Sequence, residues 1–140
     1  MRLVEDLIQK RVINMSEVLY HGPIVGISFR KDALRRLVKF TQGLIADGEE
    51  FEIIATLKHD PKNPHDQNAL EVHVGVGDAL FFVGFVPKTH NQQILAVGIE
   101  NVGVIIEKFN KDLEEVIKGI NIIVKGTEID QNHSDPVDCD

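Results

Sequence analysis

Residues 61–69, PKNPHDQNA, place several hydrogen-bonding side chains at fixed spacing beside two prolines. Proline fixes φ and moves the preceding residue out of the helical region. Asn63, His65 and Asp66 stand between and after the prolines, and Asn and Asp side chains bond nearby backbone amides in competition with regular structure. The segment is therefore either an ordered turn that directs these polar groups to one point or a flexible loop.

Potential metal ligands are also concentrated around this segment: His59, Asp60, His65, Asp66 and His73. No HxxxH or HExxH spacing on a helix accompanies them, and no cysteine is near. A Mg²⁺ nuclease site made from Asp60, Asp66 and Glu71 would lack the usual accompanying lysine pattern. The chain also has no Walker A sequence and no Ser in a G-x-S-x-G setting. We therefore expect no metal, no cofactor and no enzymatic activity.

A second chemical feature is a row of cations. Lys31, Arg35 and Lys39 recur at steps of four and so lie along one edge of a helix. Such an edge is either a phosphate-binding surface or a solvated helix face.

The elements that must position these residues follow from hydrophobic periodicity. Helices are predicted over 3–19, 32–45 and 89–98, with Asp32 and Thr89 as N-caps and a stop near Asp47-Gly48. Strands are predicted over 24–29, 51–59, 69–74, 80–86, 102–109 and 116–126. In 69–74, Leu70, Val72 and Val74 share one face. Strands follow one another too closely for a βαβ parallel sheet, so the fold class is α+β or a small barrel.

Composition supports a soluble domain. Of the 140 residues 43% are hydrophobic, enough for a core, and no apolar run approaches the roughly 20 residues of a membrane span. The first dozen residues lack a signal-peptide pattern, and the single Cys139 excludes an internal disulfide, so we expect a cytoplasmic protein without membrane association. The net charge of −7 is uneven: residues 127–140 hold five acids and no Lys or Arg, which leaves the rest at −2.

Three stretches, in order, resemble the HIRAN domain family. They are IVGISF (24–29), FEIIATLKHDPKNPHDQNALEVHV (51–74) and FFVGFVPKTHNQQILA (81–96). The similarity extends over roughly residues 22–126. HIRAN domains are OB-like small barrels that occur with helicases and nucleases of DNA repair and replication, or alone in bacteria and phages. The resemblance implies a non-catalytic module that binds single-stranded DNA at its 3′-hydroxyl end.

The resemblance also implies roles for particular residues. Phe29 falls at the position that stacks on a terminal base, a contact worth roughly 1–3 kcal/mol. Asn63 and Asp66 fall on the loop residues that bond the terminal nucleotide, with His65 where an aromatic is often found. Lys88 falls on a phosphate-binding lysine, and Arg30, Lys31, Arg35 and Lys39 are the further phosphate candidates.

Two residues depart from the family pattern and keep alternatives open. Ser28 stands where DNA-binding members have arginine, and Phe85 where histidine can occur. Strand alternation would place Arg30 and Ser28 on one face, opposite Phe29, so Arg30 replaces the missing charge only if the chain bends. The alternative is a protein-interaction module of the same fold that has lost DNA binding and docks a partner through its acidic surface. Likewise, the alternative for Asp66 and Asn68 is that they only cap the turn.

The expected organisation has three parts: a helix over 1–20 that packs on the domain or serves partner docking, a HIRAN-like domain over 21–126, and an acidic disordered tail over 127–140. The tail is either solubilising or able to fold back on the basic edge and compete with DNA.

Overall fold

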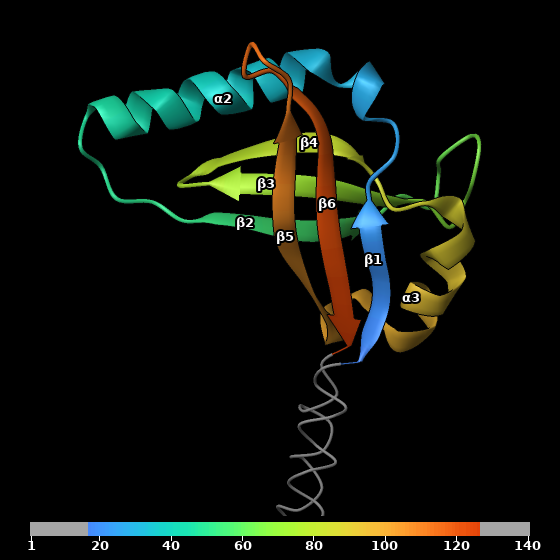
Figure 1. Cartoon of the computed structure of the whole chain (residues 1–140). Coiled ribbons are helices and arrows are strands. Elements are labelled where there is room, and N and C mark those ends of the chain that lie inside the picture. The colour runs from blue at the N-terminus through green and yellow to red at the C-terminus, as the bar shows by residue number, and fades with distance from the viewer. Residues whose placement is uncertain (1–16, 127–140) are drawn as a thin grey trace, which may run out of the picture.

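The computed structural model describes residues 17–126, which form an α+β fold of two small antiparallel sheets and two α-helices (Figure 1). The strands are β1 (Val18–Pro23), β2 (Ile53–His59), β3 (Leu70–Val76), β4 (Ala79–Phe85), β5 (Val102–Lys111) and β6 (Ile117–Gly126). The helices are α2 (Lys31–Ala46) and α3 (Asn91–Val97), with 3₁₀ turns η1 (Ile27–Phe29), η2 (Lys88–His90) and η3 (Ile99–Asn101).

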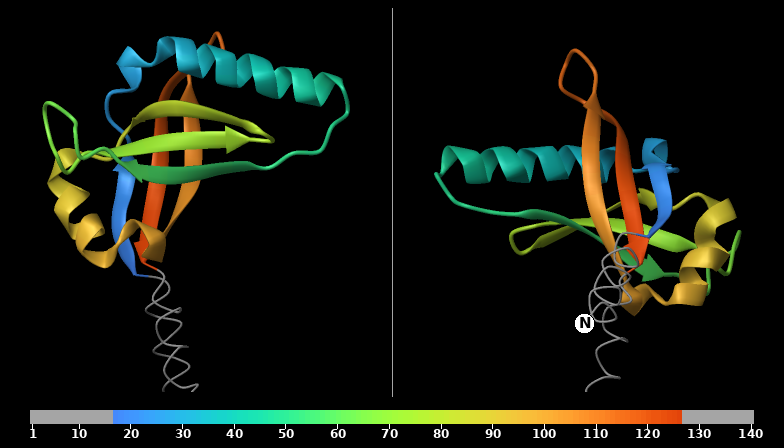
Figure 2. Two further views of the ribbon diagram at one scale, coloured as in Figure 1. Left: turned by 180° about the vertical axis from the view of Figure 1, so that it is seen from behind. Right: turned by 60° about the horizontal axis from the view of Figure 1, so that its bottom comes forward.

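The sheets have the strand orders β1-β6-β5 and β2-β3-β4, and all pairs are antiparallel. Strand β2 lies beside β5, while α2 crosses over β4 and extends past the sheet (Figures 1 and 2). Within residues 17–126 the two sheets do not close into a barrel.

The backbone at Ile24 and Val25 links the two sheets. The Ile24 amide donates to the Ile120 carbonyl at 3.0 Å, in the first sheet. Val25 and Phe85 exchange two backbone hydrogen bonds of 2.8 and 2.9 Å, in the second. The close approach of the Val25 backbone to β4 needs a glycine at position 84, because a Cβ there would lie 2.6 Å from the Val25 carbonyl oxygen.

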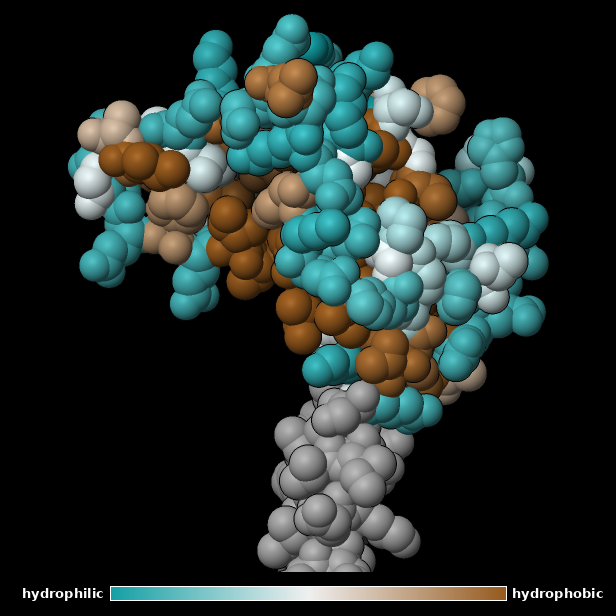
Figure 3. Space-filling view, in the orientation of Figure 1, coloured by the Kyte–Doolittle hydropathy of each residue, from teal (hydrophilic) through white to brown (hydrophobic). Residues whose placement is uncertain are grey.

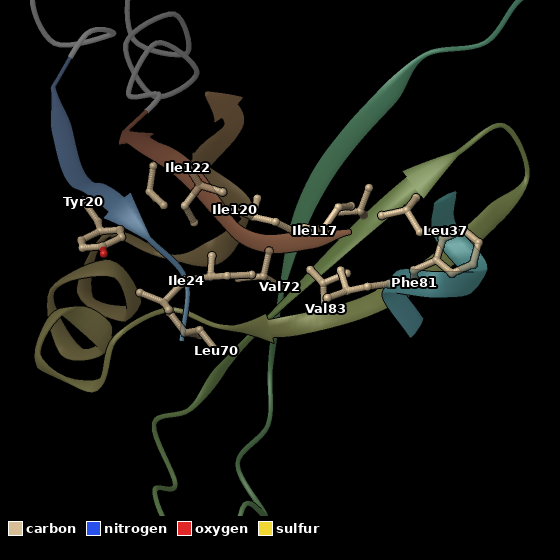
Figure 4. Packing of buried hydrophobic residues seen from close by; sticks show 14 of the residues in the cluster. Tyr20, Ile24, Leu37, Leu70, Val72, Phe81, Val83, Ile117, Ile120 and Ile122 are labelled. Carbon is tan, nitrogen blue, oxygen red and sulfur yellow. The ribbon is translucent and has the colours of Figure 1, made fainter. Parts of the chain in front are cut away.

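The core fills the space between the sheets and under α2 (Figure 4). Leu70, Val72 and Val74 have no exposed surface, which confirms the face predicted for this strand. Chain neighbours Glu71 and His73 lie on the opposite face and are partly exposed. From β6 the core receives Ile120, Ile122 and Val124, and from α2 it receives Leu34 and Leu37.

The region before α2 differs from expectation. The predicted strand over 24–29 is wrong: residues 27–29 form η1, and the strand lies earlier, at Val18–Pro23. Gly26, with φ of 78°, turns the chain out of the sheet at this point. The expected N-terminal helix over 1–20 lies largely outside the described residues, and the part within them, Val18–Tyr20, belongs to β1. The expected acidic tail over 127–140 also lies outside them.

The remaining elements follow the predictions within about two residues. Helix α2 ends at Ala46 before Asp47-Gly48, and Gly48 has a positive φ of 73°, as a helix stop requires. The two predicted caps are wrong, because Arg30 and His90 occupy the N-cap positions and neither caps through its side chain. No helix among residues 17–126 has the length and apolar character to cross a membrane.

Candidate nucleic-acid interface

The β2–β3 loop is an ordered turn held by its own Asn and Asp side chains. Asn63 Oδ1 accepts hydrogen bonds from the backbone amides of His65 (2.9 Å) and Asp66 (3.1 Å). Asp66 Oδ1 accepts one from the Asn68 amide at 2.9 Å. Backbone bonds close the loop at its base, where the Asp60 amide donates to the Ala69 carbonyl at 2.9 Å. The turn-capping role proposed for Asp66 is therefore real, and it fixes the direction of the side chains around it.

Helix α3 braces this loop through Asn91. Its Nδ2 donates to Asp66 Oδ2 at 3.0 Å, and the residue is only 2% exposed. The Asn91 Oδ1 atom is buried without a hydrogen-bond partner among the described residues. A buried polar side chain with one unsatisfied atom is costly, and the hydrogen bond to Asp66 offsets part of that cost.

The segment that leads into α3, η2, packs against β1. The Tyr20 ring packs against His90 with centroids 4.6 Å apart, and its hydroxyl donates to the Pro23 carbonyl at 2.6 Å. Burial raises the pKa of Tyr20, so this hydroxyl stays protonated as the donor.

The capacity that remains for a ligand lies at the loop surface. Asp66 Oδ1 accepts one hydrogen bond from the turn and Oδ2 accepts one from Asn91 of α3. Each oxygen has a second acceptor site, to which a hydroxyl could donate. His65 is exposed, and so is Lys88, which forms no ion pair within residues 17–126 and lies three residues before Asn91. Together these groups can bind a hydroxyl and a nearby anion.

A second cluster, on the outer face of the β2-β3-β4 sheet, is aromatic and cationic. The Arg30 guanidinium lies 3.8 Å from the centroid of the Phe82 ring. Phe82 stacks on His73, with centroids 5.0 Å apart and planes 16° apart, and packs edge-on against Phe85 at 5.3 Å. Phe29, the chain neighbour of Arg30, is 86% exposed at the end of η1. An exposed aromatic ring suits stacking with a planar ligand.

The basic edge of α2 lies along a different feature. Lys31, Arg35 and Lys39 line a groove between α2 and the β5–β6 turn. Arg35 forms an ion pair with Asp32 one turn away, whereas Lys31 and Lys39 form none within the described residues.

The nine predicted site residues therefore divide into three groups. Asn63, His65, Asp66 and Lys88 belong to the braced loop and the turn before α3; Phe29 and Arg30 lie at the outer sheet face; Lys31, Arg35 and Lys39 lie on the groove. Figure 1 shows the segment before α2, the β2–β3 loop and α3 along one side of the molecule, and the rear view in Figure 2 agrees.

Two participants were missed from the sequence. Phe82 was assigned only as part of a buried strand, yet its alternation with buried Phe81 and Val83 places it outward, and that signal was available. Asn91 had no such signal, because its role depends on a contact across 25 residues.

Metal-binding groups are not assembled in the described part of the chain. Within residues 17–126 no three His, Cys, Asp or Glu side chains are placed to hold one ion. His59 Nε2 instead lies 2.9 Å from the Gln67 carbonyl, and His73 pairs with Glu71 at 2.8 Å.

Comparison of the chain with models of known protein families finds no match. Comparisons with curated proteins and with solved structures likewise find none.

Proposed function

We propose that this chain is a HIRAN-type, OB-like module that binds single-stranded DNA at its 3′-hydroxyl end without catalysis, in DNA repair or replication. The observation that carries the proposal is Phe29. It presents an almost fully exposed ring from an ordered turn, one residue before the Arg30 that stacks on Phe82. Phenylalanine rings are normally buried, and base stacking supplies a reason for this one to be exposed.

The OB-like part of the proposal is supported by how the sheets approach one another. Strand β2 lies beside β5 on one side, and the Ile24–Val25 backbone bonds to both sheets on the other. OB folds are partly open barrels that expose one face to nucleic acid, and two antiparallel sheets joined in this way are compatible with such a fold.

In this proposal each group has a separate task. Phe29 stacks on the terminal base, and Asp66 accepts a hydrogen bond from the 3′-hydroxyl while repelling a 3′-phosphate. Asn63 fixes the turn, His65 contributes a weaker stacking surface, and Lys88 with Arg30 attracts the nearest phosphate. Lys31, Arg35 and Lys39 would contact phosphates farther along the strand.

The test is fluorescence anisotropy with two short single-stranded DNAs, one ending in a 3′-hydroxyl and one in a 3′-phosphate, at low and moderate salt. We expect tighter binding to the free hydroxyl end. Phe29→Ala should weaken binding about 5- to 150-fold, the equivalent of roughly 1–3 kcal/mol for one stacking contact. Leu113→Ala, which removes an equally exposed apolar side chain from the β5–β6 turn, is the matched control and should bind as wild type.

Asp66→Ala tests the end recognition. It should reduce the preference for the hydroxyl end over the phosphate end, whereas a purely structural role would weaken binding to both DNAs equally. Binding that ignores the 3′ group and Phe29 but disappears with salt would leave only a basic patch. Absence of binding at low salt would reject the proposal.

A protein-interaction module is the second candidate, favoured by one specific observation. Ile54 and Leu80 flank Gly75 on the outer sheet face and are 53% and 61% exposed. On the opposite face of the same sheet, the one turned toward β5, Figure 3 shows further hydrophobic surface below α2. Exposed apolar side chains that adjoin one another often mark protein contacts. Failure of both DNAs to bind would make this the leading interpretation.

A further inference from the structure

The groove between α2 and the β5–β6 turn has an apolar lining for which the proposed function has no use. Its volume is about 900 Å³, and its walls are η1, the first part of α2 and residues 114–118. The right-hand view of Figure 2 shows the β5–β6 turn rising beside α2. Apolar side chains contribute much of the lining: Ile27, Leu34, Val38, Val116 and Ile117.

The charges around this groove are unequal. Five cations line it, namely Lys31, Arg35, Arg36, Lys39 and Lys118, against three acids, Asp32, Glu114 and Glu115. Three of the cations, Lys31, Arg36 and Lys39, form no ion pair within residues 17–126, and all three come from α2. Lys118, by contrast, pairs with Asp112 at 3.8 Å. Glu115 on the opposite wall pairs with Lys111 at 3.4 Å. The α2 wall is therefore an unneutralised positive surface on a chain whose net charge is −7.

The opposite wall is preformed. Asp112 Oδ1 accepts hydrogen bonds from the amides of Glu114 and Val116, both at 2.9 Å, and the Asp112 amide donates to the Val116 carbonyl at 3.0 Å. Glu115 is held at a φ of 65°, a region that residues other than glycine seldom occupy. A ligand entering this groove would not need to order the turn, which lowers the entropic cost of binding.

The chemistry of the walls selects the kind of ligand. The apolar lining would leave a bare phosphate unsatisfied, and Glu114 and Glu115 disfavour a phosphodiester chain that runs through the groove. A peptide with an apolar side chain between acidic residues meets both conditions. Residues 135–140, DPVDCD, have this composition, with Val137 flanked by Asp135 and Asp138.

The length of chain after the fold allows such a contact. Strand β6 runs from Ile117 and Lys118 at the groove to Gly126 at the far end of the sheet (Figure 1). The eight residues from Lys118 to Gly126 span roughly 26 Å, and an extended chain needs about eight residues to return. Residues from Asp135 onward are therefore the first that can reach the groove.

We propose that residues 135–140 dock into the groove of their own chain, with Val137 on the apolar lining and the acidic side chains facing Lys31, Arg36 and Lys39. The contact does not require DNA binding. If the proposed function also holds, the docked segment competes with the strand for Lys31 and Lys39, and DNA affinity depends on displacing it.

The test uses Cys139, the only cysteine of the chain, as a site for a nitroxide spin label on the full-length protein. Paramagnetic broadening of backbone amide signals reports which surface lies near the label. We expect strong broadening at Arg36, Lys39 and Lys118 and little at Lys58. Mixing labelled chains with isotope-labelled chains that carry no nitroxide should abolish the effect, because the contact lies within one chain.

Charge reversal on the groove provides the matched comparison. Arg36→Glu with Lys39→Glu should reduce the localised broadening at least severalfold. Lys58→Glu with Lys62→Glu makes the same change in net charge at exposed positions away from the groove and should leave it intact. Amide spectra of each variant verify that the fold is kept. Broadening that is weak and uniform, centred on another surface, or equal in both variants would overturn the proposal. Broadening that persists only between different chains would also overturn it.

Discussion

The β2–β3 loop and the β5–β6 turn are shaped by the same kind of Asx hydrogen bonds but differ in their contacts with the rest of the fold. In each, one Asx side chain accepts two backbone amides: Asn63 from His65 and Asp66, and Asp112 from Glu114 and Val116. The β2–β3 loop is also bonded by the buried Asn91 of α3. The β5–β6 turn has two ion pairs, Asp112 with Lys118 and Glu115 with Lys111, both to residues of β5 and β6 themselves, and it leaves Leu113 fully exposed at its tip.

This difference shows what tertiary contacts add to a turn. A local Asx motif shapes the backbone, whereas a buried partner fixes where the side chains point relative to the rest of the fold. The braced loop is suited to recognising one small group, and the free turn is suited to forming the wall of a groove.

The largest stability effect should come from removing the Asx acceptor of the braced loop. Asn63→Ala removes two hydrogen bonds to backbone amides, at about 0.5–1.5 kcal/mol each, so we expect a loss of about 1–3 kcal/mol. Urea unfolding measures it, with exposed Gln67→Ala of the same loop as control. A loss no greater than that of the control would mean that water replaces Asn63 without cost.

Removal of the brace should have a smaller effect. Asn91→Ala loses the hydrogen bond to Asp66, which destabilises the fold, but it also removes a buried oxygen that has no partner, which stabilises it. Because these two effects partly cancel, we expect the free energy of unfolding to fall by about 1 kcal/mol. Hydrogen exchange should quicken at the amides of Asp66 and Asn68 while the β5–β6 turn is unaffected. Gln92→Ala, exposed on the same helix, is the control. Unchanged exchange in the loop would show that the Asx bonds suffice without α3.

Acidification should act on the free turn. The amide of Val116 lowers the pKa of Asp112 below its usual value, with further lowering from the Glu114 amide and Lys118. The folded carboxylate is thus favoured above the unfolded pKa, and its contribution is lost as the pH falls through the lowered value. In an NMR titration the amides of Glu114 and Val116 should shift with a midpoint below the ordinary value for an aspartate. Asp112→Asn should abolish that transition, and a midpoint at or above the usual value would contradict the account.

The smallest effect should follow from the two most exposed apolar side chains. Phe29→Ala and Leu113→Ala remove groups that contribute little to the core. The free energy of unfolding, measured by thermal denaturation, should therefore change by no more than about 0.5 kcal/mol. A substantial destabilisation by Phe29→Ala would mean that the ring has a structural role, and the reason for assigning it to a ligand would be lost.

Most of the element order could be predicted because it depends on local patterns. The alternation of Leu70, Val72 and Val74, the helical stripe of α2 and the Asp47-Gly48 stop are each set by residues near one another in the chain. Prediction failed at residues 24–29, where β-forming residues have a strand-like pattern. There Gly26 bends the chain so that Val25 can bond Phe85, a contact 60 residues away.

The sequence alone determined that residues 61–69 interrupt the strands and that Lys31, Arg35 and Lys39 share a helix edge, because proline, Asx side chains and the helical repeat act within a few residues. Only the tertiary structure decided that Asn91 braces Asp66, that Arg30 stacks on Phe82, and that the basic edge borders a groove. These contacts join residues far apart in the chain. They form only when the two sheets and α2 pack around a common core, and that packing depends on the shape of all the buried side chains together.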